Sequence, residues 1–564
     1  MTAPVFGIDA GIFSTKTAIL RTLDNAQSDV HYTNLKIPAY VSFKDDQIFV
    51  GQKAKTCSNQ NIRSSVWGNG KVLGKCERSL PKDHNIDCLE IDEDGIIKYN
   101  IANRLIQPEE ICARILRNAK EETEKYAKSK LEAAAIAVPN SFDHSQREAV
   151  MESAKIAGIK VLRLINESTA AALAILHRRR YPISRNIMIY HLGSSSFDLA
   201  VYEVGELTVE MKYSISDTNL GGHRITEAIM SWLLSYLKEN YTLSVDGLTQ
   251  KELRTQSVYV EEAVGQLLHS SESFIFVPKL NDHIMLGADV FYKICSKMLQ
   301  KTFKYIDDCL YQKNMKPGDF EELVLIGSPS KILYINKTLS QNFKITAASY
   351  TEGLAAEGAA ILGLDKYKVI ERLGTSLSYC NPVTTSKLLQ LLSESTKFPV
   401  STEIKYNQTE IEIYRGKQFV DSYSIEKPKN LARLQFSFDE NCALTLTAQD
   451  VDSNKALTVT KHKSFANSDI KLADDNSSSL ELLHNELVML INKYTRAMEQ
   501  MNVDMKYKEI FWNMCDAEWI TNPALCKDAN LISRKRNAIE MFYSFVAKPS
   551  PDNNQIYMNL TQSK

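Results

Sequence analysis

The segment that decides the fold is Asn186-Ile187-Met188-Ile189-Tyr190-His191-Leu192-Gly193-Ser194-Ser195-Ser196, followed by Leu199-Ala200-Val201-Tyr202. Its pattern predicts a buried strand, a glycine turn and a second strand. The same order occurs in residues 5–20, with Asp9-Ala10-Gly11 at the turn and His191-Leu192-Gly193 as the equivalent corner. An internal repeat of this kind predicts two similar lobes, each built around one hairpin.

Paired glycine turns suit a cleft that holds a phosphate chain. Glycines such as Gly11 and Gly193 let backbone N–H groups approach phosphate oxygens. A carboxylate beside the turn, here Asp9, can orient hydrated Mg²⁺. On the repeat alone, two unrelated hairpins are an equally good interpretation.

The first ~365 residues alternate between strand-like and helix-like patterns, which predicts an α/β domain. Ala134–Val138 and Val161–Ile165 have the pattern of buried strands. Between them, Asp143 is expected to cap a helix, with Gln146 in the capping-box position. Ser168 is expected to cap the Ala-rich helix that follows the second strand.

The pattern changes after residue 365. Residues 373–462 alternate with period two, as in Glu410–Tyr414 and Leu444–Thr447, which indicates an antiparallel β module. A polar joint near 474–478 precedes a long amphipathic helix with a capping box at Ser478-Ser479-Leu480-Glu481. The predicted parts are an α/β domain at 1–366, a linker at 367–373, a β module at 374–470, a helical bundle at 471–548 and a loose tail at 549–564.

Composition excludes several classes of function. Lys and Arg number 67 against 68 Asp and Glu, which gives no electrostatic reason to expect a nucleic-acid partner. No run of about 18 apolar residues occurs, so no membrane span or membrane partner is expected. The ten cysteines contain no C-x-x-C pair. With no signal peptide at the N-terminus, they are interpreted as reduced thiols of a cytoplasmic protein.

The stretch Val161–Ala172, VLRLINESTAAA, resembles the V-L-R-I-I-N-E-P-T-A-A-A motif of the 70-kilodalton heat-shock (DnaK-type) chaperone family. Supporting stretches are Phe6–Gly11, Ala137–Phe142, Asp217–Gly222 and Leu323–Ser328. The resemblance extends over nearly the whole chain. It implies an actin-like, two-lobed α/β ATPase domain, an antiparallel β peptide-binding module and a C-terminal helical lid.

The same resemblance implies ATP or ADP with Mg²⁺ as the ligand and assigns site residues. The catalytic candidates are Asp9, which would also orient the metal's waters, Glu167, Asp198 and Lys71. The nucleotide-binding candidates are Gly11, Gly193, Ser194, Ser195, Gly221, Gly222, Glu262, Gly327 and Ser328. Neither G-x-G-x-x-G nor G-x-x-x-x-G-K-[ST] occurs, which excludes the Rossmann and P-loop interpretations.

This sequence departs from the family at the groups that perform chemistry. His191 replaces the aspartate of the family's second hairpin, D-L-G-G-G-T, and Ser194 and Ser195 replace two of its glycines. Ile12 and Phe13 take the place of two threonines in the first hairpin. The catalytic lysine aligns with Gly70, beside Lys71, and Gly265-Gln266 replaces the family's adenosine-binding lysine–arginine pair. Several such losses together predict very slow hydrolysis.

The departures favour a divergent chaperone relative that acts as a co-chaperone. Its expected partners are an ordinary heat-shock-70-type chaperone, a J-domain protein, the ribosome or unfolded polypeptide. An ATP-driven folding chaperone and an actin-like small-molecule kinase are the alternatives. The linker Lys368–Leu373 is only partly apolar, unlike the family's acidic-plus-leucine string. Its docking on the ATPase domain is therefore an open question.

Overall fold

The computed structural model describes residues 5–462 apart from short segments, and beyond them Ile491, Tyr494 and Ile539. The segments left out are 23–27, 45–46, 59–61, 81–87, 93–94, 102–103, 180, 242–246, 347–352 and 381–386. The chain divides into two compact units, residues 1–472 and 473–564. Apart from those three residues, the predicted helical bundle and tail lie outside the described residues.

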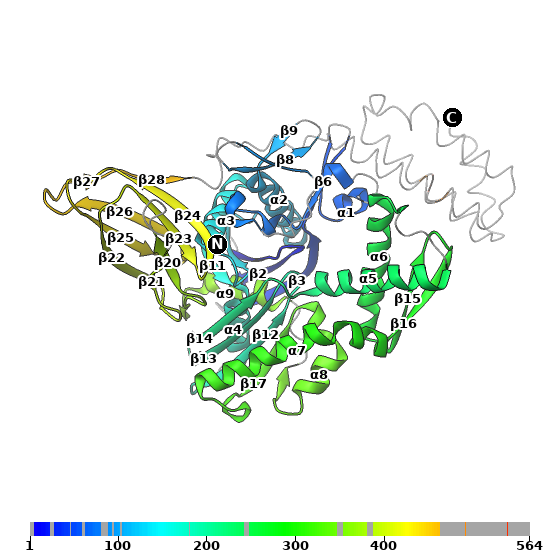
Figure 1. The fold of residues 1–564 in the computed structure, drawn as a ribbon. Coiled ribbons are helices and arrows are strands. Elements are labelled where there is room, and N and C mark those ends of the chain that lie inside the picture. Colours follow the sequence, from blue (N-terminus) through cyan, green and yellow to red (C-terminus); the bar gives the residue numbers. More distant parts are fainter. Residues whose placement is uncertain are drawn as a thin grey trace. The chain divides into compact units, whose positions relative to one another are not determined.

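A five-stranded sheet forms the centre of the first lobe (Figure 1). Its strands, in order across the sheet, are β11 (Lys160–Asn166), β10 (Ala133–Val138), β1 (Val5–Ala10), β2 (Ser14–Thr22) and β3 (Ser28–Pro38). β1 pairs antiparallel with β2 and parallel with β10, so the predicted N-terminal hairpin is confirmed. One face of β10 packs with α2 (Pro108–Ala127) and α3 (His144–Ile156), and the other packs with α4 (Glu167–Arg179).

A six-stranded sheet forms the second lobe. Its strands, in order, are β18 (Ile345–Thr346), β17 (Glu322–Ile326), β12 (Arg185–Leu192), β13 (Phe197–Val204), β14 (Thr208–Asp217) and β19 (Lys368–Ile370). The predicted hairpin is β12–β13. Its other elements are α5 (Gly222–Tyr241), α6 (Gln250–Leu267), β15 (Glu272–Val277), β16 (Asp282–Gly287), α7 (Ala288–Lys313) and α8 (Leu333–Leu339).

Helices α4 and α9 (Leu354–Ile361) join the two lobes, because one hydrophobic core contains residues of both helices and of both sheets. The two helices approach very closely. A Cβ at Gly358 would lie 1.7 Å from the carbonyl oxygen of Ala170, so only glycine fits there. The first lobe also carries smaller elements: β4 (Tyr40–Lys44), β5 (Gln47–Val50), α1 (Gln52–Ser58), β6 (Ser65–Trp67), β7 (Leu89–Ile91), β8 (Ile97–Ile101) and β9 (Arg104–Ile106).

The β module consists of two sheets with a shared core. One sheet has the order β21 (Leu389–Leu392), β20 (Leu377–Cys380), β23 (Glu410–Arg415), β24 (Gln418–Ile425) and β28 (Val459–His462). The other has the order β22 (Val400–Tyr406), β25 (Ala432–Phe438), β26 (Leu444–Asp450) and β27 (Ala456–Leu457). Every described pairing in the module is antiparallel, as the period-two pattern predicts.

The predicted linker docks on the second lobe. Its residues 368–370 form β19, which pairs in parallel with β14 at the edge of the sheet. Arg372 then forms an ion pair with Glu210 of β14 at 2.6 Å. Glu371 accepts a hydrogen bond from the backbone N–H of Asn166, at 2.9 Å. Charged and backbone contacts thus compensate for the linker's low apolar content.

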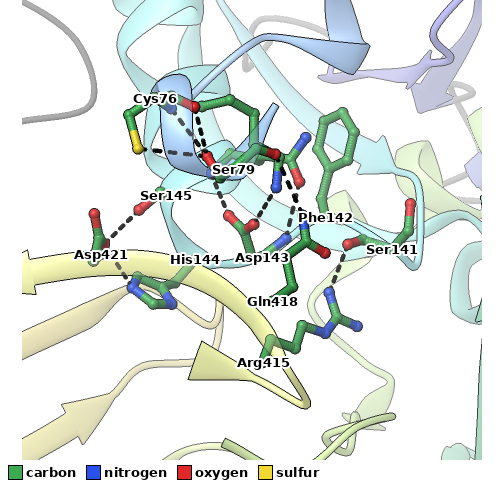
Figure 2. Close-up of polar contacts among 12 residues, drawn as sticks. Cys76, Ser79, Ser141, Phe142, Asp143, His144, Ser145, Arg415, Gln418 and Asp421 are labelled. Carbon is green, nitrogen blue, oxygen red and sulfur yellow. Dashed lines mark hydrogen bonds and ion pairs between the residues drawn. The ribbon is translucent and has the colours of Figure 1, made fainter. Parts of the chain in front are cut away.

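The β module docks on the first lobe, beside α3 and β11 (Figure 1). Asp421 of β24 contacts the side chains of both His144 and Ser145, the first two residues of α3 (Figure 2). The side chain of Asn441 accepts from the backbone N–H of Leu164 in β11 at 2.8 Å. These contacts join segments that are far apart in the sequence: Leu164 and Asn441 are separated by 277 positions.

Candidate functional site

The two hairpins place oppositely charged residues at equivalent positions. In the first, Asp9 of β1 is the cross-strand partner of Lys16 in β2. In the second, His191 of β12 is the cross-strand partner of Asp198 in β13. Lys16 Nζ donates to Asp9 Oδ2 at 2.9 Å, and both side chains are largely buried. Each turn of the repeat therefore holds one acid and one base, on opposite strands.

Glu167, the first residue of α4, completes this group. His191 Nδ1 lies 3.5 Å from Glu167 Oε2 and 3.4 Å from Asp198 Oδ2. Burial, and then the charge of Asp9, raise the pKa of Glu167 to about 8. Burial alone would lower the pKa of His191, but the carboxylates of Asp198 and Glu167 raise it. The site thus favours a protonated imidazole between two carboxyl groups.

Serine hydroxyls fix the carboxylate of Asp198. Ser196 Oγ donates to its Oδ2 at 3.2 Å, and Ser216 Oγ donates to its Oδ1. Asp198 is fully buried, so these bonds and the nearby imidazole are what offset its desolvation. The carboxylate therefore has a defined orientation toward His191.

The glycine turns pack against one another. The N–H of Gly222, at the start of α5, donates to the carbonyl of Gly193 at 2.9 Å. Gly327 has φ +88°, and a Cβ there would lie 2.0 Å from the carbonyl oxygen of Leu192. A Cβ at Gly221, with φ +144°, would lie 2.8 Å from the backbone carbon of Ser195. The close approach of these turns requires glycine at both positions.

A second group of side chains connects the lobes. Lys71 ends the short 3-10 helix at Asn69–Lys71, and its Nζ lies 3.4 Å from His223 Nε2 in α5. His223 Nδ1 donates to the carbonyl of Ser194 at 2.8 Å. The ring of Phe13 lies 5.7 Å from both the His223 ring and Lys71 Nζ. Burial and the nearby Arg224 lower the pKa of Lys71.

A cavity of about 40 Å³ opens beside the acid–base group. Of the predicted site residues it is lined by Asp9, Glu167, Gly327 and Ser328. Lys16, His191 and Lys331 line it as well. The predicted residues that do not line it are Gly11, Lys71, Gly193, Ser194, Ser195, Asp198, Gly221, Gly222 and Glu262.

The adenosine side of the predicted site is separate from this cavity. Glu262 is exposed on α6. Gln266, four residues further along this helix, accepts a hydrogen bond from Ser273 Oγ at 2.9 Å. Its side-chain oxygen is therefore engaged within the second lobe.

Sequence reasoning missed the roles of Lys16 and His223. The repeat contained a signal for Lys16: it follows Asp9 by seven residues, as Asp198 follows His191. No local pattern indicates His223, whose contact with Lys71 joins residues 152 positions apart.

The fold and the site define a two-lobed α/β domain with facing glycine turns, followed by a β-sheet module. A model of the Hsp70 protein family matches residues 5–364. The chain therefore belongs to the Hsp70 family, and its N-terminal part is an ATPase-like domain.

Similar proteins include three chaperones of the DnaK type. Chaperone protein DnaK of Mycoplasmopsis agalactiae is 27% identical over 497 residues, which cover 81% of this chain and 78% of that protein. The protein of Thalassiosira pseudonana is 28% identical, with 81% and 82% covered. That of Cyanidium caldarium is 25% identical, with 81% and 80% covered. None of the helices in the described part of this chain combines the length and apolar character needed to cross a membrane.

Hsp70 proteins bind ATP or ADP together with Mg²⁺, and the donor set of this chain fits that ion poorly. Mg²⁺ prefers oxygen ligands and its own waters. Here Asp9 is already paired with an ammonium group, and an imidazole lies at the second corner. One imidazole and two carboxylates, Glu167, His191 and Asp198, form a group that can hold a metal ion. A metal would bind there only through the neutral form of His191, and that donor set would suit Zn²⁺ better than Mg²⁺.

Proposed function

We propose that this Hsp70-family chain is a cytoplasmic co-chaperone that binds ATP or ADP weakly, hydrolyses little of it, and acts through a partner. The observation that carries the proposal is that a lysine and a histidine stand at the two corners where the family holds its metal ion. Lys16 is paired with Asp9, and His191 lies between Glu167 and Asp198.

Charge balance is the physical reason. A hydrated Mg²⁺ ion is stabilised where carboxylates are unpaired, and here it would have to displace an ammonium group from Asp9 and bring its charge close to an imidazolium. Both changes weaken Mg·nucleotide binding and the positioning of an attacking water. Loss of single catalytic groups commonly lowers rates by factors of about 10² to 10⁴. Several losses together account for little hydrolysis.

The close contacts that shape the two lobes are nevertheless present. The close turns at Gly221 and Gly327 and the helix contact at Gly358 all require glycine, and glycine is present. A rigid two-lobed domain can hold the ATPase lobes of an ordinary Hsp70 chaperone in their open conformer, which speeds release of ADP. It can equally serve as a fixed scaffold for a J-domain protein, on or off the ribosome.

Nucleotide binding is tested by calorimetric titration with ATP, with and without Mg²⁺, followed by single-turnover hydrolysis. We expect weak binding that Mg²⁺ does not strengthen, and hydrolysis at or below detection. Substitution of Lys16 by Gln frees Asp9 and is expected to increase the effect of Mg²⁺ on binding. The matched control is Lys212→Gln, which removes a lysine of β14 that pairs with Glu203 of β13 and Glu210 of β14, away from the cavity. Turnover equal to that of an ordinary Hsp70 chaperone would contradict the proposal.

The partner role is tested with a competent Hsp70 chaperone loaded with labelled ADP and, separately, with a purified J-domain protein. Faster ADP release, or a stable complex with the J-domain protein, supports the co-chaperone role. If neither occurs, a stand-alone role in holding unfolded polypeptide becomes the better account.

The alternatives have less support. An ATP-driven folding chaperone needs the metal corner that the chain's own cations occupy. The β module has no evident function in a small-molecule kinase, and membership of the Hsp70 family favours a chaperone over a kinase.

A further inference from the structure

A cavity lies where the first lobe, the second lobe, the linker and the β module meet. It leaves about 50 Å³ for the centres of water-sized molecules. One such molecule needs roughly 10–15 Å³ by this measure, so the cavity has room for a group of a few heavy atoms. Arg147 of the first lobe, Arg372 of the linker and Arg415 of the β module all line it.

Two of these arginines have only neutral partners. Arg147 is 3% exposed and donates to the carbonyl oxygens of Phe142 and Asn441 and to the side-chain oxygen of Asn166. Figure 2 shows the hydrogen bond from Arg415 to the carbonyl of Ser141. This bond is 2.6 Å long, and Arg415 also donates to the carbonyl of Asn140 at 3.2 Å. No carboxylate in the described part of the chain forms an ion pair with either guanidinium group.

The single carboxylate among the residues that line the cavity is already engaged. Asp143 forms a buried ion pair with Lys75, at 2.7 Å, and caps α3. His144, also in the lining, contacts Asp421. Among the side chains that line the cavity, arginines thus outnumber carboxylates, and burial lowers the pKa of Arg415. The buried carboxylate of Glu371 lies close to the lining and accepts from the backbone N–H of Asn166.

The third arginine is incompletely satisfied. Arg372 pairs through Nη2 with Glu210, but its Nε is buried and has no hydrogen-bond partner among the described residues. A buried N–H without an acceptor costs about 1–3 kcal/mol, and more for a charged group. An acceptor bound in the cavity offsets this cost.

We propose that this junction cavity binds a small oxyanion of phosphate size, which neutralises Arg147 and Arg415 and accepts from Arg372. Guanidinium groups bind tetrahedral oxyanions through paired N–H donors, and such bonds are stronger in a buried site. The ligand contacts the first lobe, the linker and the β module at once. Its binding therefore stabilises the docked arrangement of the β module, whether or not a nucleotide is bound in the cavity beside Asp9 and Glu167.

The test is calorimetric titration of the full chain with inorganic phosphate at constant ionic strength, with chloride as the balancing anion. The expected result is saturable binding to one site that becomes at least about tenfold weaker in Arg415→Gln. The matched control is Arg433→Gln, which removes an exposed arginine of the same module whose nearest carboxylate oxygen is 3.9 Å away. It is expected to bind phosphate like the wild type.

A further variant separates this site from the nucleotide site. Lys16→Gln alters the other cavity, and its phosphate affinity is expected to be unchanged. Loss of binding in this variant, with Arg415→Gln unaffected, would assign the phosphate to the nucleotide site and overturn the inference. An absence of saturable binding would overturn it too. If Arg415→Gln does not fold, Arg372→Gln takes its place, with weaker binding expected and wild-type affinity as the contradicting result.

Discussion

Substitution of Asp421 by asparagine is expected to release the β module from the first lobe. Asp421 is 1% exposed, and one of its oxygens lies 2.7 Å from His144 Nε2 and 2.9 Å from Lys461 Nζ. Ser145 Oγ donates to the same carboxylate (Figure 2). Asparagine keeps the shape of the side chain but removes the charge that these groups share.

The magnitude follows from burial. Removing one partner of a buried ion pair costs about 3–5 kcal/mol, because the other charge stays buried without compensation. Lys461 also pairs with Glu148, at 2.6 Å, which keeps part of its compensation. The lower end of the range is therefore expected, about 3 kcal/mol. Each 1.4 kcal/mol is a factor of ten, so the docking equilibrium shifts by roughly 100-fold.

The assay is hydrogen exchange of backbone amides, followed by mass spectrometry. We expect faster exchange in segments that the contact covers, the start of α3 and strand β24, with unchanged exchange in the second lobe. The control is Asp452→Asn, which removes an exposed carboxylate of the same module that accepts a hydrogen bond from the side chain of Asn430. Low pH provides a second perturbation. Burial alone would raise the pKa of Asp421, but Lys461 and His144 hold it below its ordinary value of 3.8.

The sign of the pH effect follows from that shift. A carboxyl group with a lowered pKa in the folded state stabilises docking above pH 3.8, and this contribution is lost as the pH falls through the lowered value. Wild-type protection in Asp421→Asn would refute the reasoning, and so would equal deprotection in Asp452→Asn. Should Asp421→Asn fail to fold, Lys461→Gln perturbs the same group from its partly exposed side, with a smaller expected effect.

Three further predictions concern the site and the core. His191→Asp alone is not expected to restore hydrolysis in single-turnover kinetics, because Lys16 still neutralises Asp9; full recovery would contradict this. Gly327→Ala is expected to lower the melting temperature by several degrees or prevent folding, since its Cβ would lie 2.0 Å from a carbonyl oxygen at φ +88°. Gly247→Ala, where a Cβ meets nothing within 4 Å, is the control. Burial raises the pKa of Glu109 from 4.5 to about 7, so the folded state binds more protons and stability falls as the pH rises between these values. Denaturant titrations at pH 5 and pH 8 give the free energy of unfolding at each pH. In Glu109→Gln the difference between these two values is expected to be smaller than in the wild type, by an amount of the order of 3 kcal/mol.

Local signals in the sequence predicted local structure. The capping box of Asp143 depends on residues three positions apart and is present, with Gln146 N–H donating to Asp143 at 3.0 Å. The cap predicted at Ser168 is wrong, because α4 begins at Glu167, directly after the last residue of β11. The Ser168 N–H instead donates to the side chain of Asn140, from the segment after β10. The side chain of Asn140 thus accepts a hydrogen bond at the start of α4, where the local pattern assigned the capping role to the serine.

For the candidate site, the sequence predicted the positions of the backbone turns but not the contacts between side chains. The repeated hairpins and their glycines placed Asp9 and His191 at corresponding corners, and the cross-strand registers agree. The partners of these side chains depend on register and on contact between lobes, which residue types alone do not specify. The sequence alone predicted a loss of catalytic groups; the structure adds that Lys16 pairs with Asp9 and that His191 lies between Glu167 and Asp198.

The dipeptide Asn166-Glu167 bears on how the two cavities communicate. Glu167 faces His191 in the nucleotide site, while Asn166 donates to Glu371 of the linker and accepts from Arg147 at the junction. A nucleotide can change the position of this dipeptide only if it binds more tightly to one of two conformations than to the other. Glu167 is buried beside His191, Asp198 and Asp9, so under the proposal of weak nucleotide binding a nucleotide gains little by moving it. Under the proposals above, docking of the β module in this chain then depends on the junction, where the arginines and their oxyanion lie, rather than on the state of the nucleotide.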